Sequence, residues 1–506
     1  MNIREYLIRN GKNYSSKPAV IFKDKETTFS SLKEAVFKLA NFLRKQGVHP
    51  SEKVAVFLPN NLEAVYSYLA VLSLGSVLVP FDFMLTSEEV INFINHSQPR
   101  VLIIYPKKDI DLQKIKKSCP SLKEIITYSK KEGFLSIEEI LEKESPDFAF
   151  PDFKQEDLAC ILYTSGSTGH PKGVMLSYKN LDNPINCIKH FLDVSSKDVI
   201  FCPGVPFSHL GGFDYLLLMS CFSQTLVLLE RFRPLEVLRC LEKYRVSFMW
   251  LVPSMYTAIL SLKEYNKFDL SSLRYVVVFG APSSKVLLKR LHQVCPQAYL
   301  LNGWGMTETS APNCVLPPGV DKIESVGKFT SWMQARIVDE EGSSLEVGQR
   351  GELWVKGEGV MLGYYKEPDL TREVLTEDGW LKTGDIAYYD EEGLFYIVGR
   401  KKDMIKVAGE IVFSPEVEEK IHLHPKVKEV AVIGVSDKLR GEVPKAFIVV
   451  KEGETLDEDE LKEFLRKHLA HFKIPHYFEF LSQLPKTRTG KIDKKLLTTL
   501  KEENKL

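Results

Sequence analysis

The sequence predicts an α/β protein with three parts. Parallel sheets occupy the first three hundred or so residues, a small antiparallel sheet or barrel follows from about residue 320, and the last hundred or so residues form a separate α+β domain. The length of 506 residues exceeds what one core usually holds. Short apolar strands alternate with helical segments, as in βαβ units. Beyond about residue 320, Gly, Pro and Asp-Glu turns separate the strands instead.

Strands and helices alternate in the first part of the chain. Short, almost continuously apolar strands are typical of parallel sheets covered on both faces, and ligands then bind at the carboxyl ends of the strands. Thr86 with Glu89 forms a capping box for a helix that runs to His96. The predicted strands are 53–58, 101–105, 158–162, 225–229, 248–252 and 275–279, and a further helix is predicted over 62–74.

From about residue 320, turns rather than helices separate the predicted strands. Strands are predicted over 335–338, 351–356 and 394–398, and a charged joint follows at 399–403. Beyond the joint, Ser414 as N-cap and Pro415 as the first helical residue open a helix. Strands at 430–434 and 446–450 come next. A last helix carries one apolar stripe, formed by Leu461, Phe464, Leu465, Leu469 and Phe472.

Composition and charge argue against several classes of protein. Lys and Arg total 67 and Asp and Glu total 67, so no net charge attracts the chain to nucleic acid. The 8 cysteines are scattered without metal-ligand spacing, which indicates reduced thiols and a cytoplasmic protein. The longest uncharged stretch, 64–81, is interrupted by Gly75 and Pro80, so we interpret it as a buried helix and strand and expect no integral membrane segment. A homodimer is compatible with the sequence.

A loop rich in glycine and hydroxyl residues follows the strand predicted over 158–162. It reads Tyr163-Thr164-Ser165-Gly166-Ser167-Thr168-Gly169-His170-Pro171-Lys172-Gly173-Val174. Glycines let the backbone approach a ligand, the N–H groups of such a turn bind anions, and Lys172 adds a compact positive charge. It is not a Walker A loop, because His170 follows Gly169. These features predict a phosphate-binding loop of another kind rather than a flexible linker.

Three further loops suit a nucleotide, although each is weak evidence by itself. In the loop 302–308, Trp304 is suited to stack on a base and Glu308 to bind Mg²⁺. Asp385, in the motif 383–385 that ends a short strand, is suited to accept ribose hydrogen bonds. A basic glycine loop occupies 485–491. A buried tryptophan, an ordinary turn and a solvated tail are the respective alternative interpretations.

Taken together and in this order, the loops resemble those of the adenylate-forming superfamily: acyl- and aryl-CoA synthetases, adenylation domains of peptide synthetases, and luciferase. The resemblance covers nearly the whole chain, and its most specific segments are 163–174, 304–308, 382–385, 399–406 and 488–491. It implies a large N-terminal domain, 1–399, with two doubly wound sheets and a small β-barrel at about 320–399. It also implies a hinge at 400–402 and a small mobile α+β C-terminal domain at 403–506.

The resemblance implies a two-step reaction with ATP, Mg²⁺ and CoA. A carboxylate attacks the α-phosphate of ATP to give acyl-AMP and pyrophosphate, and a thiol then displaces AMP. By similarity, the nucleotide-binding residues are Thr164, Ser165, Gly166, Ser167, Thr168, Gly169, Lys172, Gly280, Ala281, Pro282, Asn302, Gly303, Trp304, Gly305, Met306, Thr307, Asp385, Arg400 and Lys491. The implied catalytic residues are Lys491, Glu308, Thr164, His209 and Lys406, with Glu308 and Thr164 on the metal. The implied thiol tunnel is formed by Lys406, Val407, Ala408 and Gly409 after rotation about Lys402.

The segment 205–213 matches the family segment beside the acid. By similarity the pocket is lined by Phe207, His209, Phe213, Val252, Met255, Tyr256 and Phe279, although several of these suit a hydrophobic core equally well. Apolar side chains favour an alkyl or aryl acid. Asp214 falls outside the position of the ammonium-binding Asp in amino-acid-activating members, which disfavours amino acids. The family usually has Gly at Phe279, and our hypothesis is that this ring limits chain length in favour of medium or bent acyl groups.

CoA is the expected acceptor, because no carrier domain is fused and Asp214 stands where a carrier motif needs its attachment serine. The expected function is therefore ligation of a small-molecule acid, either a medium- or long-chain fatty acid or an aryl acid, to CoA. A stand-alone adenylation enzyme that loads a separate carrier protein is the main alternative. A luciferase-like oxygenase is a weaker one.

Overall fold

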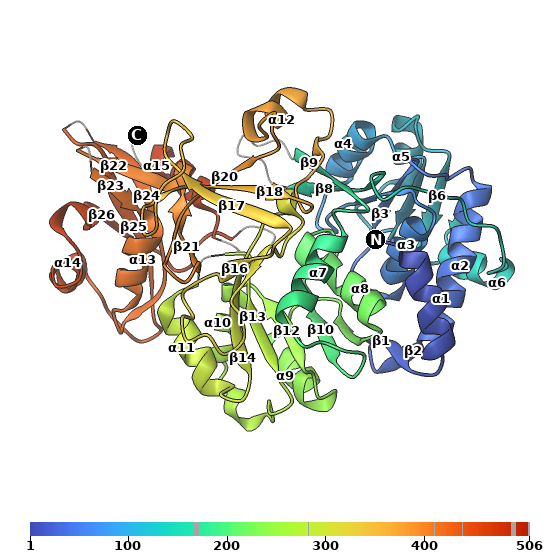
Figure 1. The fold of residues 1–506 in the computed structure, drawn as a ribbon, viewed down its shortest axis with the longest axis horizontal. Coiled ribbons are helices and arrows are strands. Elements are labelled where there is room, and N and C mark those ends of the chain that lie inside the picture. The colour runs from blue at the N-terminus through green and yellow to red at the C-terminus, as the bar shows by residue number, and fades with distance from the viewer. Residues whose placement is uncertain (165–171, 282, 409, 438, 487–491, 504–506) are drawn as a thin grey trace.

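The computed structural model describes residues 1–506 except 165–171, 282, 409, 438, 487–491 and 504–506. Its strands form four sheets, of nine, eight, four and five strands. The two large sheets lie in the N-terminal part of the chain, and the C-terminal domain, orange and red in Figure 1, stands at one end of the molecule. The expected α/β architecture is confirmed, with a large N-terminal part and a smaller C-terminal domain.

The nine-stranded sheet has the order β16-β15-β14-β13-β12-β10-β11-β1-β2. Its strands are β1 (Pro18–Phe22), β2 (Lys25–Thr28), β10 (Val199–Pro203), β11 (Thr225–Leu229), β12 (Phe248–Leu251), β13 (Tyr275–Val278), β14 (Tyr299–Trp304), β15 (Cys314–Val315) and β16 (Lys328–Phe329). The strands from β14 to β1 in this order run parallel, and β2, β15 and β16 extend the sheet in antiparallel pairs. The amino-terminal hairpin β1–β2 therefore completes a sheet whose other strands follow residue 198.

The eight-stranded sheet has the order β19-β9-β8-β4-β3-β5-β6-β7. Its strands are β3 (Lys53–Phe57), β4 (Val77–Pro80), β5 (Val101–Ile104), β6 (Glu124–Thr127), β7 (Leu135–Ser136), β8 (Leu158–Thr164), β9 (Lys172–Ser177) and β19 (Gly363–Tyr364). Strands β8 and β9 pair antiparallel, with Thr164 opposite Lys172. The predicted phosphate loop thus connects two paired strands, and its residues 165–171 lie outside the described part of the chain.

Helices cover both faces of both sheets. One continuous core contains side chains from the two sheets and from α1, α2, α3, α7 and α8, which places these helices in a shared central layer. Separate cores lie under α4 and α5 and under α9 to α11. The helices are α1 (Ile3–Asn13), α2 (Phe29–Lys45), α3 (Leu62–Ser73), α4 (Ser87–Ser97), α5 (Leu112–Ser118), α6 (Ile137–Lys143), α7 (Asp182–Phe191), α8 (Leu210–Phe222), α9 (Pro234–Lys243), α10 (Pro253–Leu260), α11 (Lys285–Val294) and α12 (Pro368–Val374).

The four-stranded sheet is antiparallel and connects the large domain to the C-terminal domain. It consists of β17 (Met333–Val338), β18 (Gly351–Gly357), β20 (Leu381–Tyr389) and β21 (Phe395–Arg400), in the order β17-β18-β20-β21. Among the described residues this order is open, so the element is a small sheet and not a closed barrel. The motif Thr383-Gly384-Asp385, expected at the end of a strand, lies inside β20.

The C-terminal domain packs helices against a five-stranded sheet. Its elements are β22 (Met404–Val407), β23 (Glu410–Phe413), α13 (Ser414–His422), β24 (Val427–Asp437), β25 (Gly441–Val450), α14 (Glu458–Arg466), β26 (Tyr477–Phe480) and α15 (Lys494–Glu503). The 3₁₀ turns of the chain are η1 (Tyr265–Lys267), η2 (Thr307–Thr309), η3 (Lys401–Asp403) and η4 (His471–Lys473).

Some local predictions are confirmed and others are wrong. The capping box of Thr86 and Glu89 is present. Ser414 is not an N-cap: it is the first helical residue, and its hydroxyl donates to the Asp403 carbonyl instead. Helix α14 ends at Arg466, so Leu469 and Phe472 continue its apolar stripe from the following turn. All eight cysteines are free thiols. None of the described helices is long and apolar enough to cross a membrane.

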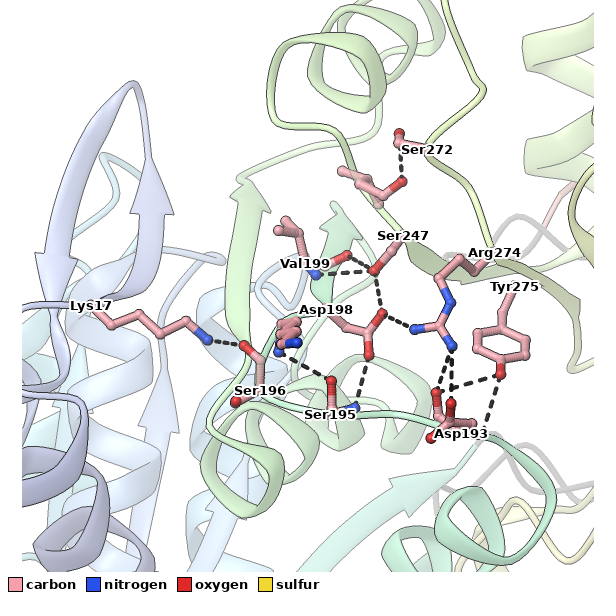
Figure 2. Close-up of polar contacts among 12 residues, drawn as sticks. Lys17, Asp193, Ser195, Ser196, Asp198, Val199, Ser247, Ser272, Arg274 and Tyr275 are labelled. Carbon is pink, nitrogen blue, oxygen red and sulfur yellow. Dashed lines mark hydrogen bonds and ion pairs between the residues drawn. The ribbon is translucent and has the colours of Figure 1, made fainter.

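A buried carboxylate fastens the amino ends of three strands of the nine-stranded sheet (Figure 2). Asp198 is 2% exposed and accepts hydrogen bonds from Ser247 Oγ, Arg274 Nη1 and the Ser195 N–H, at 2.8 Å each. Ser247 precedes β12 and Arg274 precedes β13, while Asp198 itself precedes β10. These contacts lie at the edge of the sheet opposite the carboxyl ends, so their role is structural.

We expect Asp198→Asn to lower the free energy of unfolding by about 2–3 kcal/mol, because hydrogen bonds to a buried charge are among the strongest in a protein. Thermal or urea unfolding followed by circular dichroism measures the loss. Asp193→Asn is the matched control, since that carboxylate also pairs with Arg274 but is 97% exposed, and exposed pairs contribute little. Equal losses in both variants would contradict this assignment.

Candidate functional site

The carboxyl ends of the parallel strands gather the predicted nucleotide-binding residues. Thr164 ends β8 and Trp304 ends β14. Gly280 and Ala281 follow β13, and Met306 precedes η2, which contains Thr307 and Glu308. Two chains of polar contacts connect these residues. One passes through Tyr364 and the other through Asp385.

Tyr364 connects the phosphate loop to the predicted metal ligand. Its hydroxyl donates to Glu308 Oε1 at 3.0 Å, and Lys172 Nζ lies 4.9 Å from the centre of its ring. Burial, with the Glu308 carboxylate nearby, raises the pKa of Tyr364, so the hydroxyl remains a donor at neutral pH. Glu308 is only 9% exposed. Tyr364 therefore contacts Glu308 through its hydroxyl group and Lys172 through its ring.

The donor set around Glu308 fits Mg²⁺ bound together with phosphate. Within the described residues there is no group of three or more His, Cys, Asp or Glu side chains that could form a protein-only metal site. Mg²⁺ usually keeps water and phosphate ligands and takes only one or two carboxylates. One oriented carboxylate beside the end of β8 meets that requirement, with the Thr164 hydroxyl as the second predicted ligand.

Asp385 is fixed from two directions. Trp304 Nε1 donates to Asp385 Oδ2 at 2.8 Å, and Arg400 Nε lies 3.0 Å from Asp385 Oδ1. Asp385 and Arg400 face each other across β20 and β21. Gly384 takes a φ of +71°, a conformation that favours glycine, and its N–H donates to Glu352 Oε1. Protein atoms therefore fix the orientation of Asp385, the carboxylate predicted to bind ribose.

Trp304 has a structural contact that its predicted stacking role did not include. The side chain is 7% exposed, its indole nitrogen binds Asp385, and its ring packs at 5.6 Å from that of Phe329. Asn302 and Gly303 lie on the same strand, and Gly305 follows it directly against Ala311. Stacking on adenine stays a prediction, while the hydrogen bond to Asp385 is present in the structure.

The joint between the domains lies at the end of β21, where Arg400 faces Asp385 across the sheet. Arg400 ends β21, and Lys401 Nζ forms an ion pair with Glu352 Oε2 at 2.9 Å. Lys402, the predicted hinge residue, lies in η3. Because Glu352 also accepts the Gly384 N–H, one carboxylate holds both the nucleotide motif and the residue before the hinge.

The predicted thiol-tunnel residues lie on the β22–β23 hairpin. The Lys406 side chain is exposed while its N–H donates to Glu442 Oε2, and Val407 is buried in the domain core. Ala408 has a φ of +49° and donates to the Arg440 carbonyl. Gly409, like Pro282 and Lys491, lies outside the described residues. Lys486 and Ile492, on either side of 487–491, are bridged to each other.

The predicted acid-binding residues separate into two groups. His209, at the start of α8, is partly exposed and lies 3.6 Å from Asp82, between its Nε2 and Oδ2 atoms. Val252, Met255 and Phe279 are also partly exposed. Phe207 and Phe213 are buried against Tyr68 of α3, and Tyr256 is buried on the opposite face of the sheet, with its hydroxyl on the Val277 carbonyl. These three have the burial expected of core residues.

Asp214 lies inside the central layer. It is 4% exposed, and burial raises its pKa well above the usual carboxyl value. The Asp214 carboxyl group is thus enclosed within the central layer. The expectation that amino acids are disfavoured stays a prediction.

Sequence reasoning missed several residues that organise the site: Asp82, Glu352, Tyr364 and a cluster behind the phosphate loop. In that cluster, Tyr163 precedes the loop and its hydroxyl lies 2.7 Å from His96 Nδ1, while Lys366 donates to the His96 carbonyl. In the sequence these contacts are marked only by the run Gly363-Tyr364-Tyr365-Lys366, which places two ring hydroxyls and an ammonium group side by side. Nothing in sequence spacing connects that run with His96 or Glu308.

Comparison with known proteins supports the resemblance. The family described as AMP-binding enzyme matches residues 7–365, and its C-terminal domain family matches 416–491. A long-chain-fatty-acid–CoA ligase of Bacillus subtilis is 33% identical, over 99% of this chain and 95% of its own length. Luciferin 4-monooxygenase of Photinus pyralis is 31% identical, over 97% and 92%.

A solved structure shows the same likeness. The crystal structure of an anthranilate CoA ligase in complex with anthranoyl-AMP superposes with a TM-score of 0.91 at 27% identity, over 99% of this chain and 97% of that one. The similarity covers both domains of the described fold.

We expect His96→Phe to reduce the loss of stability on acidification. Burial and Lys366 lower the pKa of His96, so the folded chain binds this proton less readily than the unfolded chain. Stability is therefore complete above the unfolded value, about 6.5, and falls as the pH drops from there towards the lowered pKa. Urea unfolding at several pH values between neutrality and mild acid measures the slope.

His190→Phe is the control for this experiment, because His190 is exposed on α7 and hydrated in both states. If the two variants show the same pH slope as the unaltered chain, His96 does not contribute to the pH dependence.

Proposed function

This chain belongs to the AMP-binding enzyme family, and from that premise we propose that it is an ATP-dependent ligase that joins a fatty or aryl acid to CoA through an acyl-AMP intermediate. The observation that carries the proposal is the pair of contact chains at the strand ends. Lys172–Tyr364–Glu308 lies beside the phosphate loop, and Trp304–Asp385–Arg400 lies beside the predicted ribose position. Together they provide the cation, metal ligand and fixed carboxylate that nucleotide activation needs.

The first step joins two anions, so positive charge is the main catalytic requirement. A carboxylate oxygen of the acid forms a bond to the α-phosphorus of ATP, and the bond to the bridging oxygen of pyrophosphate breaks. Lys172 and the hydroxyls and N–H groups of 164–169 hold the outgoing phosphates, and Lys491 contacts the acid and the α-phosphate. Glu308 and Thr164 would hold Mg²⁺, which neutralises phosphate charge when bound.

In the second step the acyl group passes from AMP to the sulfur of CoA. The sulfur of CoA attacks the acyl carbonyl, AMP leaves with the bonding pair, and the thiol proton passes to solvent. Lys406 and the turn 407–409 line the approach of the thiol after the C-terminal domain rotates at Lys402. The exposed Lys406 side chain on a hairpin fixed by Glu442 supports this placement. Separate surfaces are needed because the lysine that brings the anions together would obstruct the thiol.

One assay tests the proposal: acid-dependent AMP release from ATP and magnesium, across a panel of fatty and aryl acids, with and without CoA. We expect release that needs both acid and CoA for turnover. Release that needs a carrier protein instead would favour the adenylation alternative. The similarity to luciferin 4-monooxygenase keeps an oxygenase as the second candidate, which oxygen uptake or light emission would reveal. No acid-dependent release with any acid would contradict the proposal.

We expect Lys491→Ala to separate the half-reactions. Loss of one positioned charge lowers the rate by about 10²–10³, so acyl-AMP formation falls by that factor while supplied acyl-AMP is still converted to thioester. Lys486→Ala is the matched control. Lys486 belongs to the same basic segment, 485–491, but its ammonium group pairs with Glu429 of β24. Equal losses in both half-reactions would contradict the alternation of surfaces.

We expect Tyr364→Phe to lower ATP–pyrophosphate exchange about tenfold, because Glu308 loses a hydrogen bond that orients its carboxylate. The ring beside Lys172 remains. Tyr365→Phe is the control, since that hydroxyl faces Ser97 at 3.4 Å and not Glu308. An exchange rate unchanged in Tyr364→Phe would show that Glu308 is oriented by other contacts.

A further inference from the structure

A row of aromatic rings runs from α8 across one face of the nine-stranded sheet, over β12, β13 and β14. Tyr215 of α8 stacks on Trp250 of β12, with ring centres 3.9 Å apart and planes at 17°. Trp250 lies 5.2 Å from Phe248, which lies 5.9 Å from Tyr275, and Tyr275 lies 5.9 Å from Tyr299. Trp250 is near the carboxyl end of β12, whereas Tyr275 and Tyr299 begin β13 and β14. The row therefore runs from the site edge of the sheet towards its opposite edge.

Hydrogen bonds fix the ring at the site end of this row. Trp250 Nε1 donates to the Gly211 carbonyl at 2.7 Å, which connects β12 to the first turn of α8. The Tyr215 hydroxyl donates to the Trp250 carbonyl at 2.8 Å and accepts the Trp250 N–H at 3.1 Å. Moving the indole would break its bond to Gly211 and the stack together, while the Tyr215 ring is held in place by the Trp250 main chain. The pair is therefore a rigid part of the scaffold.

Trp250 is also the point at which burial changes. Tyr215, Phe248 and Tyr275 are almost completely buried, but Trp250 is partly exposed. Beside it, a Cβ added at Gly211 would meet no atom within 4 Å, so open space borders the first turn of α8. The indole contacts Gly211 through its nitrogen, and His209 immediately precedes the same turn of α8, at the carboxyl ends of the strands.

Phe279 limits the same space from the neighbouring strands. Its N–H donates to the Leu251 carbonyl, and its ring lies so close to Gly303 that a Cβ there would approach it to 3.0 Å. Residues two apart on a strand share a face, and Val277, two residues before Phe279, pairs with Trp250 on the α8 side of the sheet. Trp250 and Phe279 are thus two aromatic walls of one space, and the buried row lies behind the first of them.

We propose that the Trp250–Tyr215 pair is the closed inner end of the acid pocket, so that this ligase takes compact acids, aryl or short acyl, and excludes straight long-chain fatty acids. This inference rests on the proposed function and narrows its substrate class. A longer acyl chain would have to enter between α8 and the sheet. Behind the pair, the next rings of the row, Phe248 and Tyr275, are almost completely buried, and displacing them costs more than the burial of a few methylenes returns.

The test compares kcat/KM for benzoic and cinnamic acids with straight acids from butyric to palmitic. The unaltered chain should prefer the aryl and short acids. Trp250→Ala opens the inner end, and each methylene that gains a buried place raises kcat/KM about fourfold. Acids longer by two or three methylenes should therefore gain more than tenfold relative to butyric acid. Tyr299→Ala is the matched control: it removes an exposed ring from the far end of the same row and should leave the profile unchanged.

The outcomes separate this inference from the proposed function. An active enzyme that prefers palmitic acid would overturn the inference and leave the ligase assignment intact, and that result needs no variant. A profile shifted by Phe279→Gly but not by Trp250→Ala would also overturn it, because Phe279 alone would then set the length. If Trp250→Ala does not fold, as judged by circular dichroism, Trp250→Leu provides the same comparison. Absence of acid-dependent AMP release from the unaltered chain would contradict the proposed function itself.

Discussion

The site depends on one carboxylate, Asp385, whose two oxygens are bound from different parts of the chain. Trp304 reaches it from the carboxyl end of β14, and Arg400 reaches it from within the joint. Because Asp385 is 4% exposed, its charge is stabilised by these partners rather than by water, and loss of either would leave a buried charge poorly compensated. The contact therefore fixes the four-stranded sheet against the large domain and sets where the C-terminal domain begins.

A second constraint is the shared helical layer between the two large sheets. Helices α3 and α8 contribute to a core that is continuous with both sheets, and Tyr68 of α3 packs its ring against Phe207 and Phe213 at α8. This packing brings the carboxyl ends of both sheets to the same region, which is why Asp82 after β4 lies beside His209 before α8. Phe213, a predicted pocket residue, is buried in this layer and packs against Tyr68.

Polar residues at the amino ends and at the carboxyl ends of the strands of the nine-stranded sheet differ in how completely they are paired. Asp198, Ser247 and Arg274 satisfy one another at the amino ends, and the network contains its own charge balance. At the carboxyl ends, contacts with the described residues leave Glu308 and His209 only partly satisfied. Buried polar groups are normally paired, so this difference between the two edges supports the carboxyl ends as the binding edge.

The sequence by itself determined the fold class, the alternation of strands and helices along the first part of the chain, and the loops with nucleotide chemistry. These features depend on local periodicity, capping and glycine placement, as with Thr86 and Glu89 or the loop after β8. Only the tertiary structure decided that Ser414 is helical rather than a cap, that Tyr364 orients Glu308, and that Trp250 rather than Tyr256 borders the space beside α8. Each of those depends on contacts between residues far apart in the chain, and the side-chain pattern of a single strand or helix carries no information about its distant neighbours.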